Sequence, residues 1–413
     1  MVKDGTDRSL VYVLFACWLG WLITAAARQI SDIVKREIGT ALGLTTRLQI
    51  SLVVDFSFWI GYIITAVGFG ILSDKIGRKK IIYISLFLFS IPTGLFFISD
   101  AQSFIYIRFF QGFSVGGFFP VAVALLGDLN EVKNRSKAVG RFVSGGVFGA
   151  MLGWLVSGII YENFGSWQVS FLVLVPPIIG VALTNYFLLI ESPKMNAKYR
   201  DREDDSLSIG MTIKKLLMNR FLVIALLFCS LDLFTLWVVD DWIPYFVREL
   251  YGISPTDAAL FRALSAISGI MGIIFFGYFA DKFGRKKALF TAVVCGIVSL
   301  SLLLVVAVWL PFEYMYPLSA ASGFFGLGEF AAIYVLVMEN APDNRYGTAM
   351  GLCIFIGNAI ALTGGPLAAF VSDTTTLGLY AFLIVPLIAI ILRLPLSLIA
   401  KDPAFIGFGE KDE

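Results

Sequence analysis

The sequence lacks histidine and is poor in charged residues, which make up 15% of its 413 positions. Soluble domains carry about a quarter charged residues, so this composition does not fit a fully water-exposed surface. Without imidazole, the chain cannot form a histidine metal site or use histidine in acid–base catalysis. The sequence also has no G-x-x-x-x-G-K-[ST] loop, so ATP is not expected to drive the protein directly.

Cysteine is scarce as well, with four residues in the whole chain. Cys17, Cys229, Cys295 and Cys353 all lie inside apolar runs, where a thiol behaves as a small hydrophobic group. Their spacing indicates neither a disulfide framework nor a metal site. We therefore expect no cofactor and no metal.

Hydrophobic residues are abundant, at 58% of the chain. An apolar helix of about 20 residues crosses the hydrocarbon core of a membrane. Such runs lie near 10–34, 48–73, 81–99, 103–127, 137–160, 167–190, 219–246, 257–280, 288–310, 314–338, 347–371 and 377–399. We predict an all-α membrane protein with twelve transmembrane helices in two pseudo-symmetric six-helix bundles, residues 1–190 and 218–413, joined by a cytoplasmic linker loop at 191–217. The alternative, that the first run is a cleaved signal peptide, would break this symmetry.

The basic residues predict the orientation, because cytoplasmic loops are enriched in Lys and Arg. With a cytoplasmic N-terminus, the inner segments hold most of them, including Lys79, Arg135, Lys198 and Lys287. The opposite side holds only Lys35, Arg36, Arg47, Arg248 and Arg262. We expect a multi-pass protein of the cell membrane with both termini in the cytoplasm.

One charged segment occurs twice. GILSDKIGRKK at 70–80 returns as GYFADKFGRKK at 277–287, an offset of 207 residues that is constant at every matched position. Each copy follows the second apolar run of its half. The chain is therefore predicted to be a structural duplication, with two half-bundles around a central cavity, which is a common plan among transporters.

The repeated segment resembles the signature of the major facilitator superfamily, and the resemblance covers essentially the whole chain. Arg108, Gln111, Gly112 and Pro120 match a second motif of that family, and the triplet ESP at 191–193 is similar to its sugar and metabolite:proton symporter branches. The match is incomplete, because Ala27 and Val115 occupy positions that are acidic in the organic-anion branch. The Gly-Pro pair of drug antiporters is absent from the fifth run.

The resemblance implies that the repeated segments act as gates. The acid that ends the second run would lie near a helix N-terminus of the other half, where a carboxylate is stabilised. Arg78 would reach Asp128, and these contacts would break when the cytoplasmic side opens. The gating residues implied in this way are Gly70, Asp74, Gly77, Arg78, Asp128, Asp281 and Arg285.

Ionisable groups inside apolar runs are costly and mark candidate sites. At 1.5 Å per residue, Arg28, Asp55 and Arg108 lie at the same height, roughly 27 Å above the cytoplasmic ends of their runs. Two arginines around one aspartate would leave one positive charge free for an anion, or form a proton-sensitive switch at Asp55. Alternatively, Arg28 could pair with Asp32 or reach the headgroups.

A second group of charges lies near the middle of the bilayer. Asp232 and Glu329 are predicted roughly 16–18 Å above the cytoplasmic ends of their runs. Two carboxylates in one apolar cavity disfavour each other's charge, so one of them can carry a proton near neutral pH. Each could instead cap a broken helix. Trp21, Thr24, Gln111 and Trp237 are further candidates to line the path of a substrate.

The expected function is that of a secondary active transporter. It would import a small polar metabolite, either an organic anion or a sugar-like molecule, by proton-coupled symport with alternating access. The alternatives are an antiporter, exporter or facilitator, or a membrane sensor that does not transport. The expected partners are the substrate, protons and the lipid bilayer; we expect a monomer that is not an enzyme and binds no nucleic acid.

Overall fold

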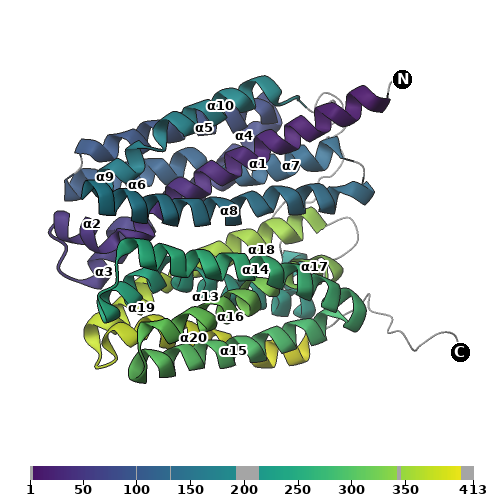
Figure 1. Ribbon diagram of the computed structural model, residues 1–413. Coiled ribbons are helices and arrows are strands. Elements are labelled where there is room, and N and C mark those ends of the chain that lie inside the picture. Colours follow the sequence, from purple (N-terminus) through teal and green to yellow (C-terminus); the bar gives the residue numbers. More distant parts are fainter. Residues whose placement is uncertain (1–2, 99, 131, 192–213, 342–345, 401–413) are drawn as a thin grey trace, which may run out of the picture. The chain divides into compact units, whose positions relative to one another are not determined.

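The computed structural model describes residues 3–98, 100–130, 132–191, 214–341 and 346–400. Every regular element within these ranges is a helix (Figure 1). The described residues divide into two compact units. The first unit takes in residues from 1–205 and the short segment 254–259, and the second takes in residues from 206–253 and 260–413.

The chain forms its helices in two series. The first consists of α1 (Lys3–Ile33), α2 (Lys35–Ala41), α3 (Arg47–Ile50), the π-helical turn η1 (Ser51–Phe56), α4 (Ser57–Ile76), α5 (Arg78–Leu95), η2 (Phe96–Ile98), α6 (Ala101–Val115), α7 (Phe118–Leu129), α8 (Val132–Phe164), α9 (Trp167–Leu172) and α10 (Val175–Leu188). The second consists of α13 (Arg220–Tyr251), α14 (Pro255–Phe283), α15 (Arg285–Trp309), η3 (Phe312–Tyr314), α16 (Met315–Gly328), α17 (Phe330–Glu339), α18 (Tyr346–Ala361), α19 (Gly364–Thr374), η4 (Gly378–Tyr380) and α20 (Ala381–Ile399).

Among the described residues, eleven helical segments are long and apolar enough to cross a membrane. The remaining predicted run, near 81–99, forms α5. Its 18 residues begin with Arg78, Lys79 and Lys80, and these charges shorten the apolar part of the helix. The all-α membrane fold is confirmed, and the prediction of twelve crossings is consistent with it.

Side chains and glycines fix several helix ends outside the apolar segments. The Asp100 carboxylate accepts the Ser103 backbone N–H at 2.7 Å at the start of α6, and this hydrogen bond lowers the pKa of Asp100. Asn219 caps α13 in the same way by accepting the N–H groups of Phe221 and Leu222. Gly252, at φ 65°, ends α13 in the left-handed conformation that glycine adopts without strain.

The helices of each unit pair in the same pattern. In the first unit α1 packs on α8, α4 on α6, and α5 on α10. In the second, α13 packs on α18 and α15 on α20. The remaining pair is α14 and α16, where the Ser268 hydroxyl donates to the Ala320 carbonyl at 2.6 Å. If the membrane spans of each half are numbered from one to six, span one packs on span five, span two on span four and span three on span six. Both halves show these pairs, as a structural duplication requires.

Several of these pairs bring main chains into direct contact through glycine. In the first unit, a Cβ added at Gly112 on α6 would overlap the Phe58 carbonyl of α4. Gly149 and Gly153 on α8 approach the α1 backbone in the same way. In the second unit, Gly272 on α14 approaches the α16 backbone. Small residues allow this close packing of membrane helices, which gains van der Waals contact where hydrophobic exclusion of water is absent.

We expect Gly112→Ala to lower the free energy of unfolding by about 1–3 kcal/mol, because the added methyl group overpacks the α4–α6 contact. The measurement is thermal unfolding of the purified protein in detergent. Gly180→Ala on α10 is the matched control, because its added Cβ would meet nothing within 4 Å. Equal unfolding temperatures for the two variants would contradict the proposed close contact.

Candidate functional site

Arg28 on α1 is a half-buried cation in the apolar part of the first unit. The centre of its guanidinium lies 5.0 Å from the centroid of the Trp59 ring of α4, in a cation–π contact. It forms no ion pair among the described residues. Arg28 can therefore offer its charge to a ligand.

The Asp55 carboxylate pairs with Lys35, a partner that the sequence interpretation did not place in this site. Lys35 Nζ contacts both Asp55 carboxylate oxygens at 2.8 Å, and the lysine side chain is fully buried. The reason is local: α1 ends at Ile33, Val34 leaves the helical conformation, and α2 begins at Lys35. This break turns Lys35 into the protein, whereas the sequence assigns it to an outer loop.

Arg28 also does not pair with Asp32, the alternative that the sequence left open. The Trp154 indole N–H of α8 donates to the Asp32 carboxylate at 3.1 Å. Asp32 is thereby held against α8. The cluster formed by Arg28, Lys35, Arg108, Asp32 and Asp55 contains three basic and two acidic side chains.

Arg108 on α6 joins three helical segments at this level. Its guanidinium donates to the Val54 carbonyl at 2.8 Å, the Ser31 hydroxyl at 2.6 Å and the Arg28 carbonyl at 3.3 Å. A fourth bond, of 2.6 Å, goes to the side-chain oxygen of Gln111. Val54 and Asp55 belong to the π-helical turn η1, a distortion that often occurs at functional sites. Arg108 therefore positions the backbone that carries Arg28 and Asp55.

The other predicted lining residues of α1, Trp21 and Thr24, lie one to two helical turns before Arg28. Trp21 packs among aromatic rings, with its centroid 4.8 Å from that of Phe119 and 6.2 Å from that of Phe142. The buried Thr24 hydroxyl donates to the Gly20 carbonyl of its own helix at 2.9 Å. The Thr24 side chain is thus engaged within α1, whereas Trp21 remains half-exposed. In the second unit, Trp237 lies half-buried on α13.

The second unit contains a buried triad of one arginine and two carboxylates. Arg393 Nη1 on α20 donates to Asp232 on α13 at 2.6 Å, and the same nitrogen donates to Glu329. Glu329 lies at the break between α16 and α17. All three residues are buried, and Glu329 Oε2 has no hydrogen-bond partner among the described residues. The triad carries one more negative than positive charge when both carboxylates are ionised.

Arg393 was missed by the sequence interpretation, although the signal was present. It is the one charged residue in the apolar run 377–399, and a charge in such a position marks a candidate site. Asp232 and Glu329 are therefore not two carboxylates in an apolar cavity, as the sequence predicts. They share a guanidinium, which reduces the cost of burying them.

The first repeated turn is built around Gly77, which separates α4 from α5 at φ 108°. A side chain there would be strained, and its Cβ would meet the Glu191 carboxylate. Glu191 accepts the N–H groups of Arg78 at 3.0 Å and Lys79 at 3.1 Å, and so caps α5. The predicted contact between Arg78 and Asp128 is confirmed as an ion pair.

The second repeated turn has a related geometry. Gly284 separates α14 from α15 at φ 94°. Arg285 contacts Glu339 at 3.2 Å and Asp281 at 3.6 Å, and the Asp281 side chain is mostly exposed. Gly70 faces open space, and the Asp74 side chain lies outside the described part of the structure. The gating role of these residues stays a prediction.

Comparison with known proteins gives a family. The model of the Major Facilitator Superfamily matches residues 10–366 and 242–407. The chain is similar to the sialic acid transporter NanX of Escherichia coli, at 24% identity over 90% of this chain and 89% of that protein. It is also similar to a gentisate transporter of Corynebacterium glutamicum, at 27% identity over 75% of this chain and 70% of that protein. Among solved structures, a D-xylose–proton symporter superposes with a TM-score of 0.74 at 16% identity, covering 95% of this chain and 98% of the other.

The duplicated helical fold, its apolar spans and its buried charges define a multi-pass membrane transport protein. The chain belongs to the Major Facilitator Superfamily, which confirms the resemblance seen in the sequence. This is a family of transporters and not of enzymes.

Proposed function

We propose that the protein is a secondary active transporter that imports a small organic anion together with a proton, by alternating access. The observation that carries the proposal is Arg28, a cation in the apolar part of the first unit that forms no ion pair among the described residues. A half-buried charge in an apolar environment is costly without a counter-ion, and a bound anion would supply the counter-ion.

The anion would bind through its carboxylate. A guanidinium offers parallel N–H donors that match the two oxygens of a carboxylate. Trp59 holds the Arg28 guanidinium from one side, which limits its rotamers and prepares it for such a contact. Two relatives of the chain are named for carboxylic acids, sialic acid and gentisate, and this supports an acid as the substrate class.

The proton would be carried by the Arg393 triad. With both carboxylates ionised, the triad has one uncompensated negative charge in an apolar environment. A proton on Glu329 would neutralise that charge. The Glu329 Oε2 atom accepts no hydrogen bond from the described residues, so it is open to the proton. Asp232 would then remain as the ionised partner of Arg393. Asp55 is a weaker candidate for this role, because Lys35 contacts both of its oxygens.

The proposed gates are the two basic turns. The Arg78–Asp128 pair ties the start of α5 to the end of α7, and Arg285–Glu339 ties α15 to α17 in the same way. Each pair would stabilise one arrangement of its cytoplasmic end. A difference of about 1 kcal/mol per pair would bias a two-state equilibrium several-fold.

The test is uptake by the purified full chain in proteoliposomes. Labelled gentisate, sialic acid and xylose are supplied with and without an inward proton gradient. We expect uptake of at least one acid, stimulated by the gradient, and no uptake of xylose. Uptake of xylose alone would contradict an anion site. Uptake of an acid that ignores the gradient would identify a facilitator.

A further inference from the structure

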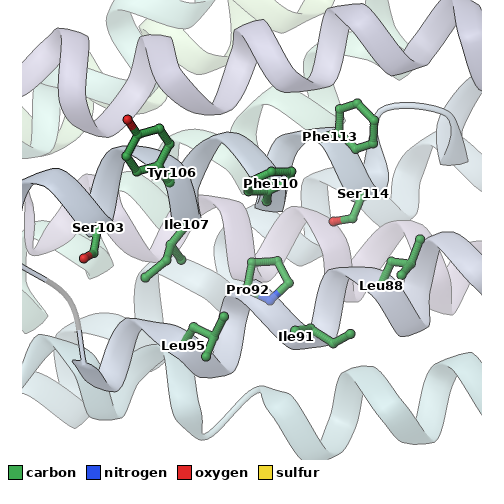
Figure 2. Close-up of a pocket in the computed structure, with 10 residues that line it drawn as sticks. All are labelled: Leu88, Ile91, Pro92, Leu95, Ser103, Tyr106, Ile107, Phe110, Phe113 and Ser114. Atoms are coloured by element: carbon green, nitrogen blue, oxygen red, sulfur yellow. The ribbon is translucent and has the colours of Figure 1, made fainter.

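A groove of about 530 Å³ lies between α5 and α6 of the first unit, apart from the charged clusters (Figure 2). Its lining is almost entirely apolar. From α5 it is lined by Leu88, Ile91, Pro92 and Leu95, and from α6 by Ser103, Tyr106, Ile107, Phe110, Phe113 and Ser114. Figure 2 shows the α5 and α6 residues facing each other across the groove.

The groove opens on the side of α5 and α6 that faces away from the interior of the first unit. Leu88, Ile91 and Leu95 follow one face of α5 and are 41%, 58% and 43% exposed, and Phe110 on α6 is 54% exposed. Arg108 on the opposite face of α6 is buried within the unit. In a membrane-spanning helix, an exposed apolar face is in contact with hydrocarbon, because water is absent at that depth. The apolar lining and the exposure of this face therefore favour an occupant from the bilayer or from another membrane protein.

The dimensions of the groove suit one leaflet. Along α6 it extends from Ser103 to Ser114, which is a rise of roughly 16 Å at 1.5 Å per residue. A leaflet contributes about half of a hydrocarbon core of about 30 Å. The groove begins beside the turn that joins α5 to α6, at the end of both spans, and stops near their middle. It thus runs in the direction of an acyl chain from the headgroup region inward.

The polar groups of the groove are unevenly placed. Ser103 and Tyr106 lie at the end near the turn, as Figure 2 shows, and the Ser103 side chain hydrogen-bonds the Asp100 carboxylate. At the inner end, the Ser114 hydroxyl is already used, because it donates to the Gln111 carbonyl at 2.8 Å. The Tyr106 hydroxyl at the headgroup end would suit an ester carbonyl oxygen of a phospholipid.

The floor of the groove adjoins the network around Arg108. Pro92 is buried at the centre of the groove, and the next residue, Thr93, accepts a hydrogen bond of 3.0 Å from the Gln111 amide. Gln111 in turn accepts from Arg108. An occupant that presses on Pro92 would therefore act one residue from the side chains that position Arg28.

We propose that the groove between α5 and α6 binds one acyl chain of a membrane phospholipid, with an ester carbonyl near the Tyr106 hydroxyl. The lipid is favoured because the groove spans a single leaflet and the Tyr106 hydroxyl lies at its headgroup end, whereas the Ser114 hydroxyl at the inner end is already bonded to the Gln111 carbonyl. A helix of a second copy would be expected to extend across both leaflets.

The test uses the full chain in vesicles of phosphatidylethanolamine that carry a photoactivatable diazirine in the acyl chain. After illumination and proteolysis, mass spectrometry locates the adducts. We expect adducts on the α5 and α6 peptides to exceed several-fold those on α15. Val298, Leu302 and Val305 of α15 are similarly exposed, at 53%, 45% and 51%, and serve as the matched surface without this groove. Equal labelling of the two surfaces would overturn the proposal.

Ile107→Trp fills the groove and is expected to reduce these adducts several-fold. Ile105→Trp is the matched control, because Ile105 lies on the same helix, is 40% exposed and does not line the groove. Cross-links between two copies of the chain at these peptides would identify a protein contact instead and would also overturn the proposal. The readout is independent of transport, so its outcome is separate from that of the uptake test.

Discussion

An Arg28→Gln variant is expected to bind its organic-acid substrate about 30- to 150-fold more weakly, because a hydrogen-bonded charge contact of about 2–3 kcal/mol is lost. Arg28→Lys keeps the charge and loses the paired donors, so its affinity for the substrate should lie between those of Arg28→Gln and the parent protein. The measurement is the substrate concentration that half-saturates counterflow in proteoliposomes, with size-exclusion chromatography as the check on folding.

The matched control for this prediction is Arg36→Gln. Arg36 is exposed on α2, close in sequence to the charged cluster but outside it. We expect it to leave the half-saturating concentration unchanged. If Arg28→Gln and Arg36→Gln behave alike while both variants remain folded, then Arg28 does not hold the anion and the leading argument for an acidic substrate is lost.

A Glu329→Gln variant is expected to exchange substrate but to lose accumulation driven by a proton gradient. Glutamine has the shape of a protonated glutamate, so the Arg393 triad would stay in its proton-loaded, neutral form. In the parent protein, symport of one proton with one monoanion could concentrate the substrate about tenfold for each unit of pH difference. In the variant, the concentration ratio should fall to that of simple equilibration.

Two matched variants sharpen the result. Glu313→Gln makes the same change at an exposed position just before α16, and it should accumulate substrate normally. Asp232→Asn removes the other carboxylate of the triad and tests which of the two carries the proton. If Glu329→Gln keeps the parent ratio of protons to substrate, the assignment of coupling to Glu329 is wrong.

The fold was largely predictable because it depends on average properties. Apolar runs long enough to cross a bilayer can be recognised one by one. The two copies of the charged segment, 207 residues apart, are found by comparing the sequence with itself. Height within the membrane also follows from counting residues, and this placed Arg28, Asp55 and Arg108 at a common level. Arg78–Asp128 was predictable because the family motif carries it.

Side-chain partners were harder to predict, because they depend on helix rotation and on local breaks. Lys35 reaches Asp55 only because α1 stops at Ile33, and no feature of the surrounding residues marks that stop strongly. Two residues at the same height can still face different neighbours, as Arg28 and Asp55 do. Arg393 is a different case, since an isolated charge in an apolar run is visible in the sequence.

The glycine contacts between α4 and α6 and between α1 and α8 have a mechanical consequence. Where one backbone lies directly on another, no side chain remains at the contact that could change rotamer and absorb a displacement. A push on one helix is therefore passed to its neighbour with little loss. Each such pair of helices should move as one rigid body. A small displacement caused by a bound ligand at one point can then be transmitted along the full length of the pair.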